Sequence, residues 1–269
     1  MSTQFFTGLL PSHDGQGDGG LFPVYSPDPG SLLGDDDLRE IFSSRKRSRD
    51  VMPFSKFGTN QNPYQSCCSH GERNAIVRSI FARTGDFIDL QPHSAYAWIN
   101  GGRDQGAALS DAMKEMEEHG FLTTADARKD QIYLSQFPKG IWTKAQRFRG
   151  HAMEARDERT YLTGLARGLF GAIATDVNDA YANWNGHGLT PVGNGVGNHC
   201  VCADDAEWDD GLRKFVITGP GSWGGDWGDG GYWRHTWDQV KRPNQNHTFY
   251  LIEAAFDDPE DKTAPPSVG

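Results

Sequence analysis

Two adjacent cysteines and a histidine stand close together in the segment NQNPYQSCCSHG, residues 60–71. A cysteine acts as a nucleophile when it is a thiolate, with a base nearby and with donors for the oxyanion that forms on the substrate. Cys67 stands where a helix is predicted to begin, and a helix N-terminus lowers the pKa of a thiol. The side-chain amide of Gln61, a few residues upstream, could bind the oxyanion together with the backbone N–H of Cys67.

The base that such a cysteine needs is expected in the second half of the chain. His199 lies in GNHCVCA, at the start of a predicted strand, about 130 residues after Cys67. Nucleophile and histidine are about that far apart in one class of cysteine peptidases. Strand alternation places His199 and Val201 on one face and Cys200 and Cys202 on the other, where the two cysteines are expected to be small buried residues.

A metal site is the alternative interpretation of these side chains. The candidate ligands are Cys67, Cys68, His70, His199, Cys200 and Cys202. Structural zinc sites typically use pairs of the form C-x2-4-C, and adjacent cysteines and a C-x-C do not fit that spacing. We therefore expect no metal and no cofactor, with Cys68 buried behind the nucleophile and His70 on the surface.

The composition limits the possible partners and the compartment. The 269 residues fit one large domain or two small ones, and the net charge of −10 argues against nucleic acid. The one basic run, RKRSR at residues 45–49, is interpreted as a solvated linker. No apolar run approaches the roughly 18 residues of a membrane span, and the N-terminus lacks the pattern of a secretory signal. Four cysteines form a poor disulfide framework, so we expect a cytoplasmic or particle-associated protein, with a virion as one such particle.

Helices are predicted first along the chain and strands second, which indicates an α+β fold. Apolar periodicity predicts helices near residues 68–85, 106–120 and 158–169, and a short helix in DLREIFSS. Short β-type runs follow in FGAIATDV, NHCVCAD, RKFVITG, GYWRHTW and HTFYLIEAAF. We divide the chain into an extended or propeptide-like arm (1–48), a domain (49–256) and a polar tail (257–269).

Three segments resemble the motifs of papain-family cysteine peptidases. NQNPYQSC is similar to NQGxCGSC, with Gln61 in the oxyanion position and Cys67 in the nucleophile position. GNHCV is similar to GHAV, and GSWGGDWGDGGY (residues 221–232) is similar to NSWGxxWGxxGY. The segment INGGRDQGAALSDAMKEMEEHG also resembles the region after the catalytic helix, in the form seen in bacterial and viral relatives. The resemblance covers residues 50–255 approximately, and the motifs follow the family's order.

The resemblance implies a two-lobe fold with the substrate cleft between the lobes. The helical lobe would span residues 49–157 and the mainly β lobe residues 158–256. Trp223 would shield the histidine, and Asn100, Gly101 and Gly102 would line the cleft. The family's orienting Asn falls on Gly221, which has no side chain, and Asp204 or Asp205 could take its place.

Two functions remain open from the sequence. The first is a papain-like endopeptidase that hydrolyses peptide bonds through Cys67 and His199, with a peptide or protein as substrate. The second is a catalytically degenerate papain-like component of a virion or other large particle, which would use residues 1–48 to dock on neighbouring subunits.

Overall fold

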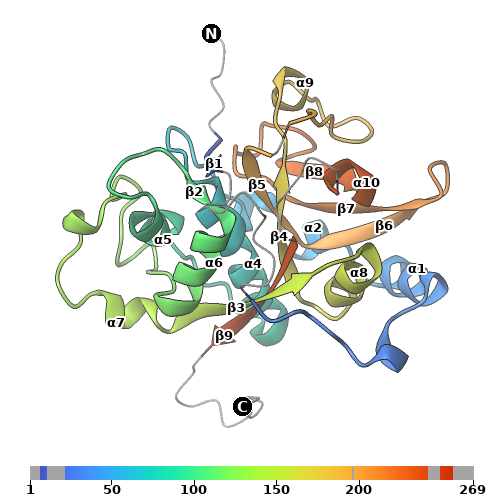
Figure 1. Cartoon of the computed structure of the whole chain (residues 1–269), viewed down its shortest axis with the longest axis horizontal. Helices are drawn as coiled ribbons and strands as arrows, with labels where there is room; N and C mark the ends of the chain where they lie inside the picture. The colour runs from blue at the N-terminus through green and yellow to red at the C-terminus, as the bar shows by residue number, and fades with distance from the viewer. Residues whose placement is uncertain (1–6, 11–21, 196, 242–248, 257–269) are drawn as a thin grey trace.

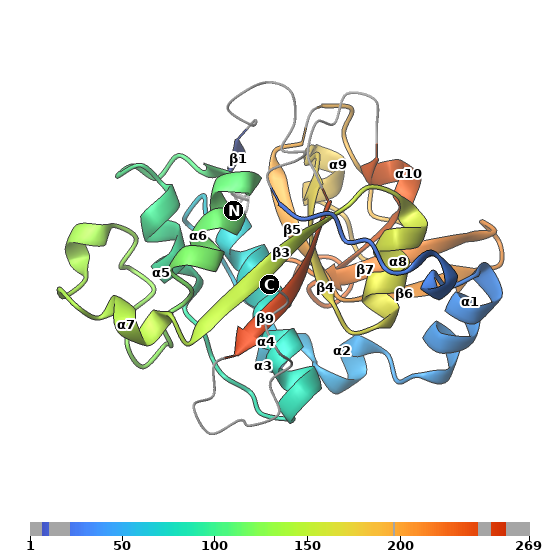
Figure 2. The same ribbon diagram turned by 60° about the horizontal axis from the view of Figure 1, so that its bottom comes forward.

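The computed structural model describes residues 7–10, 22–195, 197–241 and 249–256, and it shows a helical lobe beside a β-rich lobe (Figure 1). The helical lobe contains α4 (Cys67–Thr84), α5 (Pro92–Ile99), α6 (Leu109–Glu118), η2 (Leu134–Gln136) and α7 (Trp142–Ala145). The β-rich lobe contains β4 (Phe170–Thr175), β5 (His199–Ala203), β6 (Asp205–Asp209), β7 (Lys214–Pro220) and β8 (Tyr232–Thr236), with α8 (Glu158–Ala166), α9 (Asp179–Ala182) and α10 (Trp237–Val240). Strands β3 (Phe148–Ala155) and β9 (Phe249–Phe256) lie between the two groups (Figure 2). The α+β fold with two lobes is therefore as predicted, and the tail 257–269 lies outside the described residues.

Helix α4 is buried along most of its length and joins the two lobes. It begins at Cys67 and is followed by Gly85 in a left-handed conformation (φ 77°), as the sequence predicts. Its charged residues are buried as well as its apolar ones. Arg73 donates to the carbonyls of Phe57 (2.7 Å) and Leu90 (3.0 Å) on the helical side. Arg78 pairs with Asp204 at 2.5 Å on the β side.

The larger sheet has the strand order β3-β9-β4-β5 and is antiparallel throughout. Its two faces belong to two different hydrophobic cores. Cys200 and Cys202 of β5 pack with Cys67 and the apolar residues of α4, whereas Val201 packs with Trp223 in the core of the β lobe. This confirms the alternation predicted for this strand.

A smaller antiparallel sheet, β6-β7-β8, completes the β lobe. All five β-type runs identified in the sequence form strands, and the helices predicted near 68–85, 106–120 and 158–169 are present as α4, α6 and α8. Strands β3 and β6 are not expected from the sequence. Strand β3 falls within the range assigned to the helical lobe, yet all eight of its residues pair with β9.

The described part of the N-terminal arm from residue 22 onward wraps around the β lobe. It contains η1 (Pro29–Ser31) and α1 (Asp35–Ser44), which is the short helix predicted there, followed by α2 (Ser48–Val51) and α3 (Phe54–Phe57). Leu38 and Phe42 of α1 are buried in the core of the β lobe with Phe215. None of the described helices is long and apolar enough to cross a membrane.

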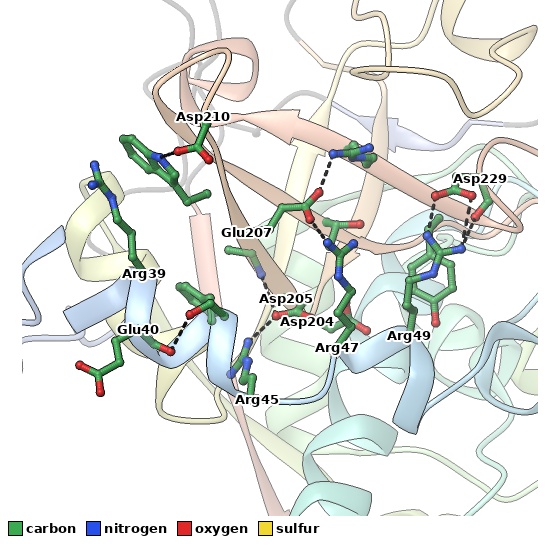
Figure 3. Close-up of a pocket in the computed structure, with 17 residues that line it drawn as sticks. Arg39, Glu40, Arg45, Arg47, Arg49, Asp204, Asp205, Glu207, Asp210 and Asp229 are labelled. Atoms are coloured by element: carbon green, nitrogen blue, oxygen red, sulfur yellow. Dashed lines mark hydrogen bonds and ion pairs between the residues drawn. The ribbon is translucent and has the colours of Figure 1, made fainter. Parts of the chain in front are cut away.

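The basic run at residues 45–49 is bound to the β lobe, so its interpretation as a solvated linker is wrong. Three ion pairs hold it: Arg45 with Asp205 (2.6 Å), Arg47 with Glu207, and Arg49 with Asp229 (2.5 Å) (Figure 3). These residues line a cavity of about 520 Å³. Because the guanidinium groups face carboxylates, the cavity offers no large excess of positive charge to an anionic ligand.

Candidate active site

Cys67 and His199 meet where the two lobes join. Cys67 is the first residue of α4, and His199 is the first residue of β5. The thiol and the imidazole form a hydrogen bond, which favours the thiolate form of Cys67. The fold therefore brings together the two side chains that the sequence analysis paired.

The Cys67 thiol is nevertheless completely buried, with 0% of the residue exposed. Burial raises its pKa well above the usual value, and a hydrogen bond with Cys68 raises it further, whereas the contact with His199 lowers it. Cys68 is buried behind it, as predicted, and donates to the carbonyl of Ala107 (3.6 Å). In this conformation the thiol is protonated at neutral pH and is not poised to attack.

The side chain of Gln61 is fixed by hydrogen bonds to Ser222, Tyr64 and Thr7. Its Oε1 accepts a hydrogen bond from the Ser222 hydroxyl (2.5 Å), and its backbone N–H donates to the Ser222 carbonyl (2.8 Å). Its Nε2 donates to the carbonyls of Tyr64 (3.0 Å) and Thr7 (3.3 Å). The amide that the sequence places at the oxyanion position thus binds a peptide carbonyl of the N-terminal segment.

The segment Thr7–Leu10 lies between the lobes and contacts both of them (Figure 1). The backbone N–H groups of Gly8 and Leu9 donate to the carbonyl of Asn198 (3.2 and 3.1 Å), the residue before His199. On the other side, β1 (Leu9–Leu10) pairs in parallel with β2 (Ala107–Ala108), and Ala107 N–H donates to the Gly8 carbonyl (2.8 Å). Leu9 is buried in the same core as Cys67. The chain's own N-terminus therefore closes the site.

Glycine is required at position 8 by this close approach. A Cβ atom built on Gly8 would lie 2.0 Å from the carbonyl oxygen of Gln65, and the residue has φ +154°. Gly106 faces it from the other strand, where a Cβ would lie 2.1 Å from the Gly8 carbonyl oxygen. Any side chain at position 8 is incompatible with the seated segment.

The imidazole of His199 is surrounded by aromatic rings. The Trp223 ring lies 4.7 Å from it, tilted by 30°, and the Tyr181 ring lies 6.3 Å from it at 75°. Asp204 and Asp205, which could have oriented His199, lie beyond the other end of β5 and pair with arginines instead. Among the described residues, neither of them contacts His199.

The three residues suggested for the cleft lie at a turn after α5. Asn100 is buried, and its side chain donates to the Ile132 carbonyl and accepts from Gly102 N–H (2.8 Å). Gly101 and Gly102 are exposed and have positive φ. The backbone that binds the N-terminal segment is that of Ala107, a few residues further on. Apart from the nearby glycines, nothing in the sequence indicates that Ala107 binds this segment.

His70 is buried rather than on the surface, so that expectation is wrong. Its Nδ1 lies 2.7 Å from the Thr59 hydroxyl, and its Nε2 lies 3.4 Å from Nε2 of His93, which in turn lies 3.0 Å from the Ser66 hydroxyl. Burial lowers the pKa of His70 well below its usual value, and the neighbouring His93 lowers it further. Burial and the charge of Lys129 lower the pKa of His93 to about 4. Both rings are therefore neutral in the folded protein.

We expect these two histidines to make the fold sensitive to acid. An unfolded histidine binds a proton near pH 6.5, whereas the folded rings stay neutral down to much lower pH. Their contribution to stability is full above pH 6.5 and is lost as the pH falls below that value, for His93 down to about pH 4, at up to about 1.4 kcal/mol per pH unit for each ring. Urea unfolding at pH 7.5 and pH 5 should show this loss. The loss should shrink in His93→Gln but not in His151→Gln, which alters an exposed histidine. An equal loss in both variants would contradict this account.

Among the described residues, no three of the cysteines and histidines considered as metal ligands lie close enough together to share an ion. The group of three potential ligands that does is Glu115, Glu118 and His119, and His119 is paired with Glu115 (3.2 Å). The chemistry available at Cys67 is therefore that of its own thiol with His199.

Comparisons with known proteins agree with this fold. The chain is similar to three solved cysteine-protease structures, each at 16% sequence identity. Xylellain, a cysteine protease from Xylella fastidiosa, has a TM-score of 0.65 over 94% of this chain and 99% of that one. Digestive procathepsin L 3 from the larval midgut of Tenebrio molitor has a TM-score of 0.59 over 72% of this chain and 65% of that one, so this chain spans just under two thirds of it. Bromelain from Ananas comosus, in complex with the E64 inhibitor, has a TM-score of 0.56 over 72% of this chain and 92% of that one.

These similarities show that the chain has a papain-like fold. No protein-family model matches the sequence, and no curated protein matches it. At 16% identity the activity does not follow from the similarity and is argued from the site itself.

Proposed function

We propose that the chain is a papain-like cysteine endopeptidase of the type found in bacteria and viruses. In this proposal Cys67 attacks a peptide carbonyl as a thiolate, and His199 transfers the proton to the leaving amine. Gln61 Nε2 and the backbone N–H of Cys67 stabilise the oxyanion, while Trp223 shields the imidazole. The observation that carries the proposal is the hydrogen bond from Gln61 Nε2 to the Thr7 carbonyl, because it places a peptide carbonyl on the proposed oxyanion donor.

The contacts of Thr7–Leu10 also support a peptide as the substrate. The hydrogen bonds of this segment to Gln61, Ala107 and Asn198 are all formed by its backbone groups. Such backbone contacts need no particular side chain from an extended peptide, except that the residue in the place of Gly8 must be glycine. An extended peptide or protein segment is therefore the substrate class that this site fits.

The same contacts imply that the N-terminal segment inhibits the enzyme until it is displaced. While it is seated, the Cys67 thiol is buried and its pKa is raised, which disfavours the thiolate. Displacement would expose the thiol and remove the largest cause of that shift. His199 and the N-terminus of α4 would then both favour the thiolate.

Gly8→Ala in the full-length chain is expected to activate the site, because the added Cβ cannot fit beside Gln65. We expect an epoxide-based thiol inhibitor to label Cys67 at least about tenfold faster than in the wild type, since the equilibrium shifts to the open state. Peptide cleavage should rise in parallel. The adduct is mapped by mass spectrometry. Gly30→Ala is the matched control, because a Cβ there meets nothing within 4 Å.

The second candidate is a catalytically degenerate component of a virion or other particle that docks through residues 1–48. The buried thiol and the glycine at position 221 favour it. Against it, residues 22–48 are largely engaged with the chain's own β lobe rather than free for a partner. If Gly8→Ala exposes the site and Cys67 still does not react, this second candidate is the better account.

A further inference from the structure

The orienting Asn of papain-like sites is replaced here by a glycine whose surroundings leave little room for a side chain. A Cβ on Gly221 would lie 3.1 Å from the Trp227 ring and 3.4 Å from the Gly231 carbonyl. The backbone of Gly221 is also fixed, because its N–H donates to that same carbonyl (2.8 Å). Another part of the structure must therefore fix the plane of the His199 imidazole.

No hydrogen bond from a side chain other than Cys67 reaches His199 in the described part of the chain. The Nδ1 atom of His199 is buried and has no hydrogen-bond partner among the described residues. The residue is only 1% exposed, so bulk solvent has little access to this atom. Contacts between rings are the remaining means of orientation.

Two of these rings meet the imidazole at very different angles. The Trp223 ring is tilted by 30° against the imidazole, with the ring centres 4.7 Å apart, whereas Tyr181 meets it edge to face, at 6.3 Å and 75°. Because these rings contact the imidazole at different angles, its rotation about the Cβ–Cγ bond would disturb both contacts. Trp227 supports both neighbours, since it stacks on Tyr181 (5.2 Å, 19°) and meets Trp223 at 83°.

Tyr181 is itself held rigidly by its backbone. Its N–H donates to the side chain of Asn178 (2.9 Å), which caps α9, and its carbonyl accepts from the Trp227 indole N–H (3.4 Å). The side chain is completely buried, and its hydroxyl finds no hydrogen-bond partner within the described ranges of the chain. Burial raises the pKa of this phenol, and the nearby Cys67 and Cys200 raise it further, so it remains neutral beside the nucleophile. A tyrosine so fixed, yet without a bond for its hydroxyl, contributes through its ring.

We propose that Tyr181 is a positioning residue for His199 and that the aromatic box of Tyr181, Trp223 and Trp227 replaces the orienting Asn. Only the expected effect on catalysis rests on the proposed function. The orientation of the imidazole is a property of the folded chain, whether or not peptides are cleaved. In this proposal the box holds the imidazole beside Cys67 by shape, without a hydrogen bond to Nδ1 from any described residue.

The test compares Tyr181→Leu with Tyr181→Phe in the full-length protein labelled with ¹³C-histidine. In the wild type and in Tyr181→Phe, the His199 ring should give one Cε1–Hε1 signal shifted by the neighbouring rings. In Tyr181→Leu that signal should lose much of its shift and broaden, because the edge-to-face wall is gone. In the Gly8→Ala background, Tyr181→Leu should lower kcat for a peptide about tenfold with little change in KM, and Tyr181→Phe should restore it.

Tyr161→Leu is the matched control, because Tyr161 is equally buried, also has an unpartnered hydroxyl and packs on Trp237 and Phe249 instead. It should lower stability without moving the His199 signal. If Tyr181→Leu does not fold, Tyr181→Met supplies similar volume without a ring. An unchanged His199 signal in the ringless variant, or a Tyr181→Phe variant as altered as Tyr181→Leu, overturns the proposal. If the wild-type signal behaves as expected but no variant cleaves peptides, the proposed function fails and the box stands.

Discussion

Cys67→Ala is expected to abolish peptide cleavage in the Gly8→Ala background, with kcat lowered by a factor of about 10⁴ or more. Removal of a covalent nucleophile leaves only the contributions of binding and of the oxyanion donors, which is why such losses are large. The fold should be retained, because the change removes one buried sulfur atom from a large core. The measurements are initial rates on a fluorogenic peptide and epoxide labelling mapped by mass spectrometry.

Cys202→Ala is the control for this experiment. Cys202 is equally buried, but it lies two residues beyond Cys200 on the strand, in the core against α4, and Tyr181 and Trp223 are not its neighbours there. Its replacement should therefore leave both cleavage and labelling in place. Labelling that maps to Cys68, or cleavage that survives in Cys67→Ala, would show that the nucleophile has been assigned to the wrong residue.

The helix α4 shows how far periodicity in the sequence can be used. Its start at Cys67 and its end before Gly85 follow from capping and turn preferences, which act locally. Its burial does not follow, because Arg73 and Arg78 make the helix look solvent-exposed on two sides. Each has a partner far along the chain or on another element, and such pairing is visible only in three dimensions. The wrong expectation for His70 has the same cause.

Strands β3 and β6 were not expected because their sequences, FRGHAMEA and DAEWD, contain few β-branched residues. Strand β3 is stabilised by its full-length pairing with β9, and β6 pairs along its whole length with β7. The carboxylates of β6 also pair with the basic run of the arm. The position of each charged segment therefore depends on the other. Strand propensity is assigned to each segment separately, so it does not show that two segments stabilise each other.

The sequence motifs do pair Cys67 with His199, because the types and order of these residues depend on the chemistry that they would perform. Three features had no such signal. They are the seating of Thr7–Leu10, the backbone contact at Ala107 and the position of Tyr181 beside the imidazole. Each of these features depends on shape and backbone contacts. Many different sequences could provide them, so they leave no motif in the sequence.

Arg78→Met is expected to lower the free energy of unfolding by about 3–5 kcal/mol at pH 7.5, because it leaves the buried carboxylate of Asp204 without its partner. Both side chains are 0% exposed, and their charged atoms lie 2.5 Å apart. Arg78 also donates to the Met52 carbonyl (3.3 Å) and the Tyr232 hydroxyl (3.2 Å), so its removal loses hydrogen bonds as well. Urea unfolding followed by circular dichroism measures the loss.

The pH dependence of that loss identifies its origin. Burial raises the pKa of Asp204 to about 6, although Arg78 opposes this shift, so Arg78→Met should raise it further. A carboxyl group with a raised pKa gives its full stability below the unfolded value of about 3.9 and loses it as the pH rises through the folded value. The difference between wild type and variant should therefore be larger at pH 7.5 than at pH 4.5. The double variant Arg78→Met/Asp204→Leu should recover much of the stability, since no buried charge is then left alone.

This ion pair matters for the site because it joins the same two elements that carry the catalytic candidates. Arg78 lies on α4, which begins at Cys67, and Asp204 directly follows β5, which begins at His199. The contact between Cys67 and His199 at one end and the ion pair at the other therefore fix the helix against the strand at two points. Arg83→Met, on the exposed end of α4, should cost no more than about 1 kcal/mol. If Arg78→Met costs no more than Arg83→Met, the ion pair does not hold the lobes in register, and the position of Cys67 must depend on the apolar core alone.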